Sequence, residues 1–305
     1  MNTIYTLADL RDWKKRGGSV SPPIRLGVVG NPVAQSFSPR MQNAAVEECG
    51  LDLQYAAFQI APEELSEAIS LFRELEFVGL NLTVPHKMAA VALVDEVEKR
   101  ARKIGAINTI AVVEGKLVGH NTDGPGFVRA IREEFAVDLR DLRIFLLGAG
   151  GGAGRALAHR CALENCERLV LSSRTFEKAQ SLARELAAHF AGPRVLGPEA
   201  RLEEVRWESA TWRTQIARTD LVINATSLGL KVSDPSPLPH PLIEPHLMIY
   251  DLIYNPARTA LLEAAAESGA RGANGLSMLL HQGALAFEIW FDRAAPLAAM
   301  RAALP

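Results

Sequence analysis

The chain has 305 residues, of which 48% are hydrophobic and 22% are charged, and its formal net charge is −2. This balance is ordinary for a globular protein and gives no support to a nucleic-acid or membrane-surface partner. No apolar run is long enough to cross a bilayer, the N-terminus lacks a signal-peptide core, and the histidines lack metal-ligand spacing. The cysteines (Cys49, Cys161 and Cys166) form no C-x-x-C pair, which indicates reduced thiols in a cytoplasmic protein without a metal site.

The first half of the chain alternates strand and helix patterns after a short N-terminal extension. Residues 1–23 predict a short helix and a linker. Strands are expected over 24–30, 54–60 and 78–84, and a hairpin over 107–113 and 116–119. Helices are expected over 38–50 and 62–76, from residue 87 and from about residue 95. Ser38 followed by Pro39 is typical of a helix start, with Ser38 as the N-cap.

The second half repeats the alternation. Strands are expected over 142–147, 168–172, 220–225 and 248–252, and helices over 127–135, 155–162, 176–190, 259–268, 276–291 and 295–303. Residues 191–219 have no clear pattern. Such alternation predicts parallel sheets with helices on both faces.

A glycine-rich turn joins the apolar strand ending at Leu147 to the Ala-rich helix that follows. Gly148, Gly150 and Ala153 fit the G-x-G-x-x-G/A spacing of a dinucleotide-binding turn. Glycine lets the backbone approach a pyrophosphate, and the free amides at the helix start can hold the anion. With the strand and the helix both in place, the motif predicts a nucleotide site. A Gly-rich turn without a ligand is the alternative.

Two α/β domains follow from this order of elements. Residues 24–123, together with C-terminal helices at 276–305 that pack back on them, are expected to form a substrate-binding and catalytic domain with a mainly parallel sheet. Residues 124–275 are expected to form a Rossmann-type dinucleotide-binding domain around the glycine turn.

The residues after the next strand distinguish between the two nicotinamide cofactors. Ser173 and Arg174 stand where an NAD-binding fold usually has a carboxylate. The Arg174 guanidinium can bind a 2′-phosphate, which a carboxylate would repel, and Lys178 adds a second positive charge. These residues predict NADP rather than NAD. A solvated helix start is the alternative.

Polar side chains follow three predicted strands of the first domain, where open α/β sheets bind ligands. They are Ser36 and Ser38, then Asn81, Thr83 and Lys87, and then Asn108, Thr109, Asn121 and Asp123. Hydroxyls and amides gathered in this way suit a polyhydroxylated ligand, and one Lys with one Asp suits proton transfer. His86 is expected to be structural or superficial rather than catalytic.

Nine short blocks, in order, resemble the shikimate dehydrogenase family over residues 24 to about 292. They are 36–39 (SFSP), 81–87 (NLTVPHK), 105–109 (GAINT), 121–124 (NTDG), 148–155 (GAGGGAGR), 174–175 (RT), 224–227 (NATS), 250–254 (YDLIY) and 274–282 (NGLSMLLHQ). Residues 1–23 lie outside the resemblance.

The resemblance implies a role for each matching residue, beginning with Lys87 and Asp123 as the catalytic pair. The substrate side would comprise Ser36, Ser38, Asn81 as a support, Thr83, Asn108, Tyr254 and Gln282. The cofactor side would comprise Gly148, Ala149, Gly150, Gly151, Gly152, Ala153, Ser173, Arg174, Thr175, Lys178, Thr226, Ser227, Leu252 and Gly275.

The chain departs from the family pattern at three places on the cofactor side. The glycine loop carries one added residue, which leaves the pairing of amides with phosphate oxygens open. Ser173 replaces the usual Asn, and Lys178 is a shorter side chain at a commonly basic position. NADP should still bind, but with lower affinity.

The reaction implied is the reversible NADPH-dependent reduction of 3-dehydroshikimate to shikimate, a step of chorismate and aromatic amino acid biosynthesis, by a monomer or homodimer. One alternative is a quinate/shikimate dehydrogenase that uses NAD or NADP, or a related aminoshikimate-pathway dehydrogenase. Another is a non-catalytic paralogue that binds NADP or shikimate. Lys87 and Asp123, both present, favour the enzyme.

Overall fold

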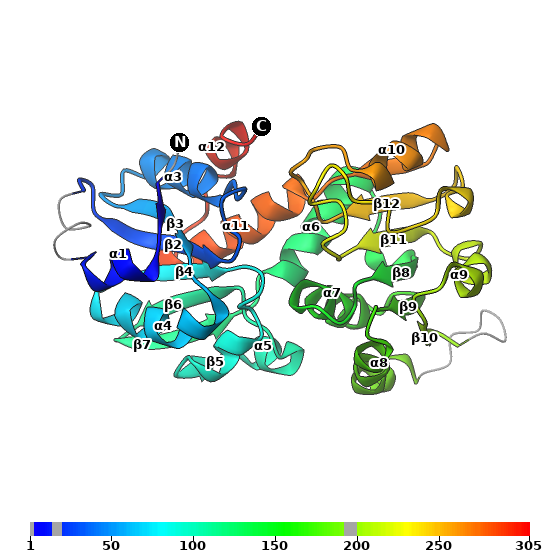
Figure 1. Cartoon of the computed structure of the whole chain (residues 1–305), viewed down its shortest axis with the longest axis horizontal. Coiled ribbons are helices and arrows are strands. Elements are labelled where there is room, and N and C mark those ends of the chain that lie inside the picture. The colour runs from blue at the N-terminus through cyan, green and yellow to red at the C-terminus, as the bar shows by residue number, and fades with distance from the viewer. Residues whose placement is uncertain (1–2, 14–19, 192–199) are drawn as a thin grey trace. The chain divides into compact units, whose positions relative to one another are not determined.

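The computed structural model describes residues 3–13, 20–191 and 200–305 and falls into two compact units (Figure 1). The first unit is Met1–Gly126 with Leu279–Pro305, and the second is Phe127–Met278. The boundaries fall inside helices α6 (Asp123–Phe135) and α11 (Leu276–Phe291). The expected fold class, two α/β units with a discontinuous first one, is confirmed.

The first unit is built on a seven-stranded sheet with the order β1-β3-β2-β4-β6-β7-β5. Its strands are β1 (Ile4–Tyr5), β2 (Ile24–Gly30), β3 (Gln54–Gln59), β4 (Gly79–Leu82), β5 (Glu96–Val97), β6 (Thr109–Val113) and β7 (Lys116–His120). Strand β6 runs antiparallel to both its neighbours, and the other pairs are parallel. The polar ends of β2 and β4 therefore lie at one edge of the sheet.

Helices cover both faces of this sheet (Figure 1). They are α1 (Leu7–Arg11), α3 (Ser38–Glu48), α4 (Leu65–Glu74), α5 (Lys99–Ile104), α12 (Leu297–Ala302) and the 3₁₀ turns η1 (Pro62–Glu64) and η2 (Ala89–Ala92). Helices α1 and α4 share a core with the sheet in which Trp13, Phe58 and Phe72 are buried. The C-terminal helices return to this unit as predicted: α12 packs against α3, and Trp290 of α11 donates to the carbonyl of Ile110 at 2.9 Å.

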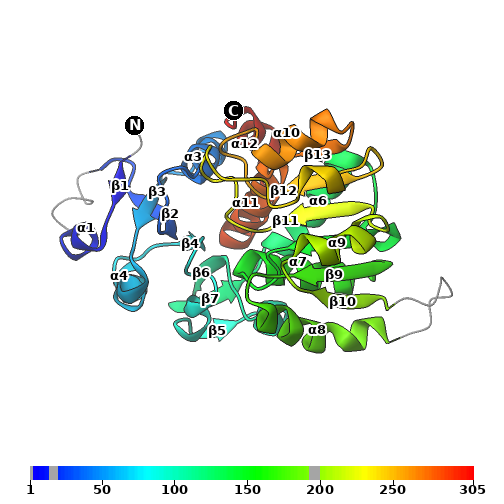
Figure 2. The same ribbon diagram turned by 45° about the vertical axis from the view of Figure 1, so that its right-hand side comes forward.

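The second unit has a six-stranded parallel sheet with the order β10-β9-β8-β11-β12-β13 (Figure 2). Its strands are β8 (Arg143–Leu147), β9 (Arg168–Ser172), β10 (Leu202–Val205), β11 (Leu221–Asn224), β12 (Met248–Asp251) and β13 (Arg271–Ala273). Its helices are α7 (Gly152–Leu163), α8 (Phe176–Phe190), α9 (Ser209–Ile216) and α10 (Ala260–Glu267), with 3₁₀ turns η3 (Leu139–Asp141) and η4 (His240–Leu242). Phe145 and Leu147 of β8 share one buried cluster with Trp212 of α9, as alternation along a strand requires.

Several helix starts differ from the predicted positions. The helix expected from about residue 95 begins at Lys99 instead: Glu96–Val97 is a strand, and α5 begins after Glu98, whose side chain accepts the amides of Arg100 and Ala101. The helix expected at Lys87 is reduced to turns and η2, because the carbonyl of Lys87 accepts the amide of Ile107 at 2.8 Å. Helix α6 begins four residues early, at Asp123 rather than at 127.

Ser38 is not the N-cap of α3. The cap is Phe37, and Ser38 is already helical, so its hydroxyl makes no capping hydrogen bond. The sequence did not predict three elements: the short strand β1 in residues 1–23, and β10 and α9 in residues 191–219. Residues 14–19 of the predicted N-terminal extension and residues 192–199 of the unassigned stretch 191–219 lie outside the described residues. Among the residues that are described, no helix is long and apolar enough to span a membrane.

Candidate functional site

Lys87 and Asp123 form an ion pair in the first unit. The ammonium Nζ lies 2.7 Å from Asp123 Oδ2, and the two side chains are 16% and 4% exposed. Lys87 lies just beyond β4, whereas Asp123 is the first residue of α6, where the positive end of the helix dipole favours a carboxylate. The predicted catalytic pair is thus brought together, largely withdrawn from water.

Asn108 holds the other side of the Asp123 carboxylate. Its amide nitrogen Nδ2 donates to Asp123 Oδ1 at 2.8 Å and to Thr122 Oγ1 at 2.9 Å. Its carbonyl Oδ1 accepts the backbone amide of Thr122 at 2.8 Å. Each carboxylate oxygen therefore has its own donor, so the orientation of Asp123 is fixed.

Asn81 lies behind this group, in the middle of a buried chain of hydrogen bonds. Its Nδ2 donates to the carbonyl of Asn108 at 3.2 Å and to Thr109 Oγ1 at 3.1 Å. Its Oδ1 accepts from the Tyr55 hydroxyl at 2.9 Å. Tyr55 is a supporting residue that the sequence did not identify, because only the register of β3 against β2 and β4 brings it near.

Gln282 joins the group from α11. Its Oε1 accepts from Asn108 Nδ2 at 3.2 Å, and its own Nε2 donates to the carbonyl of Leu279. This approach requires a glycine at 126, because a Cβ there would lie 2.7 Å from the Gln282 amide nitrogen. The first turn of α6 and the start of the first-unit part of α11 therefore touch at the site.

The two serines and Thr83 lie after β2 and β4. Ser36 Oγ accepts the amide of Ser38 at 3.2 Å; Ser36 is half-buried and Ser38 is buried. The methyl of Thr83 occupies the space that a Cβ at Gly30 would need. Tyr254, the remaining predicted substrate residue, lies in the second unit, in the segment after β12, and is half-buried.

The glycine turn lies between β8 and α7 in the second unit. Gly148 has a φ of +87°, and a Cβ there would lie 2.8 Å from the backbone of Ala225. The amides of Gly148 and Ala149 both donate to the carbonyl of Ser172. Gly151 is the N-cap of α7, so Gly152 and Ala153 stand in its first turn, where helices leave amides free for an anion.

The third small position of the fingerprint is Gly154, not Ala153. A Cβ on Gly154 would fall on the carbonyl oxygen of Gly148, whereas Ala153 is only half-buried. The added residue in the loop shifts this close helix–strand contact by one position. The run of glycines in the sequence hid the shift, because several registers fit it equally well.

Ser173 and Lys178 approach the glycine turn from the neighbouring strand and helix. A Cβ at Gly150 would lie 2.9 Å from both Ser173 Oγ and Lys178 Cβ. The turn, a hydroxyl and the stem of a lysine therefore converge, which fits a phosphorylated nucleotide. Arg174 and Thr175 lie beside them and are exposed.

The other cofactor candidates lie at the ends of β11 and β12. Thr226 is half-buried and Ser227 is exposed, both just after β11. Leu252 follows β12, and its backbone fills the place of a Cβ at Gly275. The second unit thus brings the predicted cofactor residues to the ends of β8, β9, β11 and β12.

His86 is buried, and its Nε2 lies 2.8 Å from the carbonyl of Ile60, which agrees with a structural role. Burial lowers the pKa of His86. His240 and His246 are exposed. Within the described ranges, no group of three His, Cys, Asp or Glu side chains could hold a metal ion.

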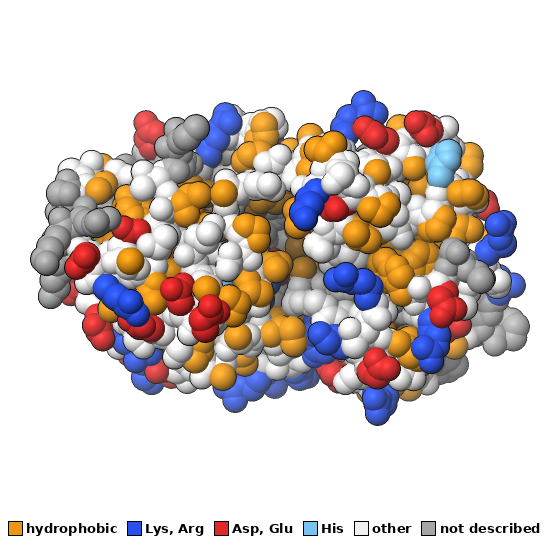
Figure 3. Space-filling model, in the orientation of Figure 1, with side chains coloured by type: hydrophobic (Ala, Val, Ile, Leu, Met, Phe, Trp, Pro, Cys, Tyr) orange, Lys and Arg blue, Asp and Glu red, His pale blue; other side chains and the backbone are white. Residues whose placement is uncertain are grey.

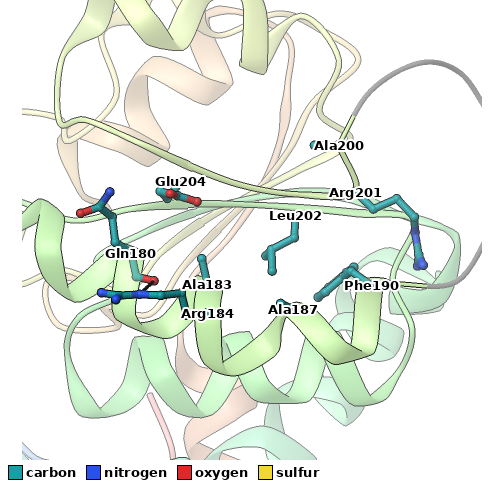
Figure 4. A pocket seen from close by; sticks show the side chains of 9 residues that line it. All are labelled: Gln180, Ala183, Arg184, Ala187, Phe190, Ala200, Arg201, Leu202 and Glu204. Atoms are coloured by element: carbon teal, nitrogen blue, oxygen red, sulfur yellow. Dashed lines mark hydrogen bonds between the residues drawn. The ribbon is translucent and has the colours of Figure 1, made fainter.

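A separate hollow of about 660 Å³ lies between α8 and β10. In Figure 4 the side chains of Gln180, Arg184 and Glu204 line it. None of the predicted site residues lines it, so we assign it no ligand.

Comparisons with known proteins agree with the geometry. The family model of the shikimate dehydrogenase substrate binding domain matches residues 28–110, and that of the shikimate 5′-dehydrogenase C-terminal domain matches residues 275–304. The shikimate dehydrogenase (NADP(+)) of Methanopyrus kandleri is 40% identical over 284 residues, which cover 92% of this chain and 94% of that protein.

Solved structures are similar over the same extent. Shikimate 5-dehydrogenase from Thermus thermophilus, in complex with NADP(H) and shikimate, is 37% identical with a TM-score of 0.78, over 92% of this chain and 100% of that chain. Quinate dehydrogenase from Corynebacterium glutamicum, in complex with NAD, is 27% identical with a TM-score of 0.79, over 92% and 98%. The chain belongs to the shikimate dehydrogenase family.

Proposed function

We propose that this chain catalyses the reversible reduction of 3-dehydroshikimate to shikimate with NADPH, the step of chorismate and aromatic amino acid biosynthesis expected from the sequence. The observation that carries the proposal is the ion pair of Lys87 and Asp123 beside Asn108 and Gln282 in the first unit. In this proposal the first unit holds the substrate, and the second unit holds NADP.

The residues of the second unit fit NADP. The turn at Gly150 lies against Ser173 and Lys178, and Arg174 is exposed next to them, free to meet a 2′-phosphate. The amides of Gly148, Ala149 and Gly151 are engaged with backbone carbonyls. We therefore assign the pyrophosphate to the first-turn amides of α7. Bound NADPH would supply the hydride that reduces the substrate carbonyl.

Lys87 supplies the proton in this mechanism. As the carbonyl carbon gains a hydride, negative charge develops on its oxygen, and the Lys87 ammonium stabilises that charge and donates a proton to it. In the oxidation direction the neutral amine accepts the proton of the shikimate hydroxyl. Asp123 binds the reacting hydroxyl and keeps the amine in place, while Asn108 keeps Asp123 in place.

The remaining polar groups bind and orient the ring. Ser36 and Ser38 would bind the substrate carboxylate with neutral hydroxyl donors, and Thr83 and Gln282 would bind ring hydroxyls. Asn81 is a support, because both ends of its amide are already satisfied within the protein. Ser38 is available for this role because its hydroxyl does not cap α3.

The test crosses two substrates with two cofactors. We expect purified protein to reduce NADP⁺ with shikimate fastest, and NAD⁺ or quinate to give much lower kcat/KM. A higher kcat/KM with quinate and NAD⁺ would assign the chain to the quinate branch, represented by the C. glutamicum structure. Binding of NADP⁺ without turnover of either substrate would favour a non-catalytic binding protein.

The cellular setting is also a proposal. We propose a cytoplasmic monomer or homodimer whose partners are small molecules rather than nucleic acid. On the face drawn in Figure 3, acidic and basic side chains are interspersed, and neither sign forms a broad continuous patch. Light scattering after size exclusion would give the mass in solution, against 33.1 kDa for one chain.

A further inference from the structure

A buried carboxylate that the mechanism does not use lies at the end of β12. Asp251 has no exposed surface, and neither has Asn224, its register partner at the end of β11. A charged group withdrawn from water is costly unless donors surround it. At this position, the free energy cost is offset by a set of hydrogen bonds that connect two segments of the chain.

Three donors converge on Asp251. Its Oδ1 accepts from Asn224 Nδ2 at 2.9 Å and from the amide of Ile253 at 3.1 Å. Its Oδ2 accepts from the Thr259 hydroxyl at 2.7 Å. Thr259 is also the N-cap of α10. The carboxylate therefore fixes the course of the chain from β12 to α10, the segment 252–259.

Asn224 extends the network to the segment 225–229 after β11. Its Oδ1 accepts the amide and the hydroxyl of Thr226, at 3.0 and 2.7 Å. Its Nδ2, besides donating to Asp251, donates to the carbonyl of Leu228 at 3.2 Å. Rotation of the Asn224 amide would break contacts on both sides, so Asp251 sets its orientation.

The two segments also touch each other and the glycine turn. A Cβ at Gly229 would lie 3.1 Å from side-chain atoms of Ile253 and Thr259, and the turn at Gly148 packs on Ala225. Thr226 and Ser227 lie on one segment, and Leu252 and Tyr254 on the other. Displacement of either segment would therefore move groups predicted to contact the cofactor or the substrate.

We propose that Asp251 is a positioning residue that holds the segments 225–229 and 252–259 in the arrangement required for hydride transfer. It acts on the first segment through Asn224 and on the second through Ile253 and Thr259. The inference rests on the proposed function, because that reaction gives the two segments their role. Asp251 itself does not touch the reacting atoms.

The test compares Asp251→Ala and Asp251→Asn with a control at the opposite end of the neighbouring strand β11. Asp220 precedes β11 and accepts from the backbone and guanidinium of Arg143, so Asp220→Ala disturbs the sheet away from the cofactor. Burial raises the pKa of Asp251 to about 6, so assays at about pH 8 compare the ionised carboxylate with its replacements. Asparagine keeps the size and one acceptor.

For Asp251→Ala we expect kcat to fall roughly 10- to 100-fold, the loss that small misplacement of reacting groups produces. The Kd of adenosine 2′,5′-bisphosphate, which lacks the nicotinamide half, should stay within about twofold of wild type. The fall in kcat should be smaller in Asp251→Asn than in Asp251→Ala. Asp220→Ala should keep the wild-type kcat but have a lower free energy of unfolding. A hydride isotope effect on kcat that persists or grows in Asp251→Ala would locate the defect in the transfer step.

An unchanged kcat in both Asp251 variants would overturn the proposal. So would an equal loss of adenosine 2′,5′-bisphosphate binding, which indicates general damage to the unit. If Asp251→Ala does not fold, the same measurements on Asp251→Asn and Thr259→Val test the proposal. Thr259→Val removes one donor to the carboxylate.

If the wild-type protein is inactive on shikimate, the proposed function is refuted but the positioning role of Asp251 is not. The positioning role is then tested by binding. The Kd of NADP⁺ should rise about fivefold in Asp251→Asn while that of adenosine 2′,5′-bisphosphate is unchanged, and equal changes in the two constants would contradict it.

Discussion

At the scale of single residues, the ion pair of Lys87 and Asp123 is the most informative feature. A charged pair this far withdrawn from water is weak as a source of stability, because desolvation opposes the attraction. It is well suited to moving a proton, since Asp123 is held from both sides and the ammonium has donors left over. The arrangement therefore favours catalysis over a structural role.

Replacement of Lys87 tests this assignment. Lys87→Ala should lower kcat by at least roughly 100-fold, the contribution of a positioned proton donor, and should leave the KM for shikimate closer to normal. Steady-state kinetics would measure both. The exposed Lys116, which pairs with Glu96 in the same unit, provides a control, since Lys116→Ala should keep both constants. Turnover near wild type in Lys87→Ala would contradict the mechanism.

Arg174 should decide cofactor choice. Arg174→Ala should raise the KM for NADPH roughly 10-fold, because a charge-assisted hydrogen bond to the 2′-phosphate is lost, and should change the KM for NADH little. Arg184 lies exposed on α8, the helix that follows Arg174, and Arg184→Ala should leave the preference for NADPH over NADH intact. Equal effects on the two cofactors would mean that Arg174 does not meet the 2′-phosphate.

His159, buried between α7 and α8, should make the protein sensitive to acid. Burial, followed by the charge of Arg155, lowers the pKa of His159 from 6.5 to about 4; Glu185 opposes this shift and His189 adds to it. The unfolded chain binds a proton that the folded chain does not. The stability contributed by neutral His159 is therefore complete above pH 6.5 and is lost as the pH falls toward 4.

Urea unfolding of His159→Gln would measure that effect. The loss of unfolding free energy between about pH 7.5 and pH 5 should be smaller than in wild type by about 1 to 2 kcal/mol. The exposed His240 serves as the control in His240→Gln. A pH dependence identical to wild type in His159→Gln would show that this histidine is not the acid-sensitive group.

At the scale of elements, strong local patterns predicted the structure well. The helix Phe176–Phe190 and the strand Arg168–Ser172 begin and end where expected. The hairpin turn at Glu114 and Gly115 has positive φ at both residues, 50° and 76°, as a type I′ turn requires. In these places the period of the apolar residues and the turn chemistry point the same way.

Elements defined by distant contacts could not be predicted. The two-residue strands β1 and β5 exist only because β3 and β7 provide edges to pair with. The helix expected from Lys87 does not form as predicted, and the carbonyl of Lys87 accepts the amide of the distant Ile107. The local sequence carries no information about these partners, so each of these segments was misread or missed.

The glycine turn gives a prediction at this scale. Gly154→Ala should lower the thermal stability of the cofactor-free protein and weaken NADP⁺ binding, because the new Cβ would fall on the carbonyl oxygen of Gly148 and force α7 away from β8. Overpacking of this kind costs roughly 1 to 3 kcal/mol. Thermal unfolding and NADP⁺ titration would measure the two effects.

Gly151 provides the matched control for the effect of Gly154→Ala on thermal stability. It is the N-cap of α7, and a Cβ there meets nothing closer than 3.7 Å, so Gly151→Ser should keep the thermal midpoint. If Gly154→Ala is as stable as Gly151→Ser, the close contact belongs to another glycine of the loop.

At the scale of the whole molecule, the order of the blocks carried more information than any one of them. Lys87 and Asp123 lie 36 residues apart and meet at 2.7 Å, which their spacing could not show but the family resemblance implied. The supports of the site were missed because they depend on strand register. Tyr55 reaches Asn81 from β3, and Asp251 meets Asn224 only because β11 and β12 pair in register.

The most direct test of the account is one reaction followed to its products. Purified protein with shikimate and NADP⁺ should increase the absorbance of reduced nicotinamide, and chromatography should find one 3-dehydroshikimate for each NADPH formed. The same mixture with Lys87→Ala should show almost none of either. Failure of the wild type to form NADPH and 3-dehydroshikimate in equal amounts would contradict the central claim.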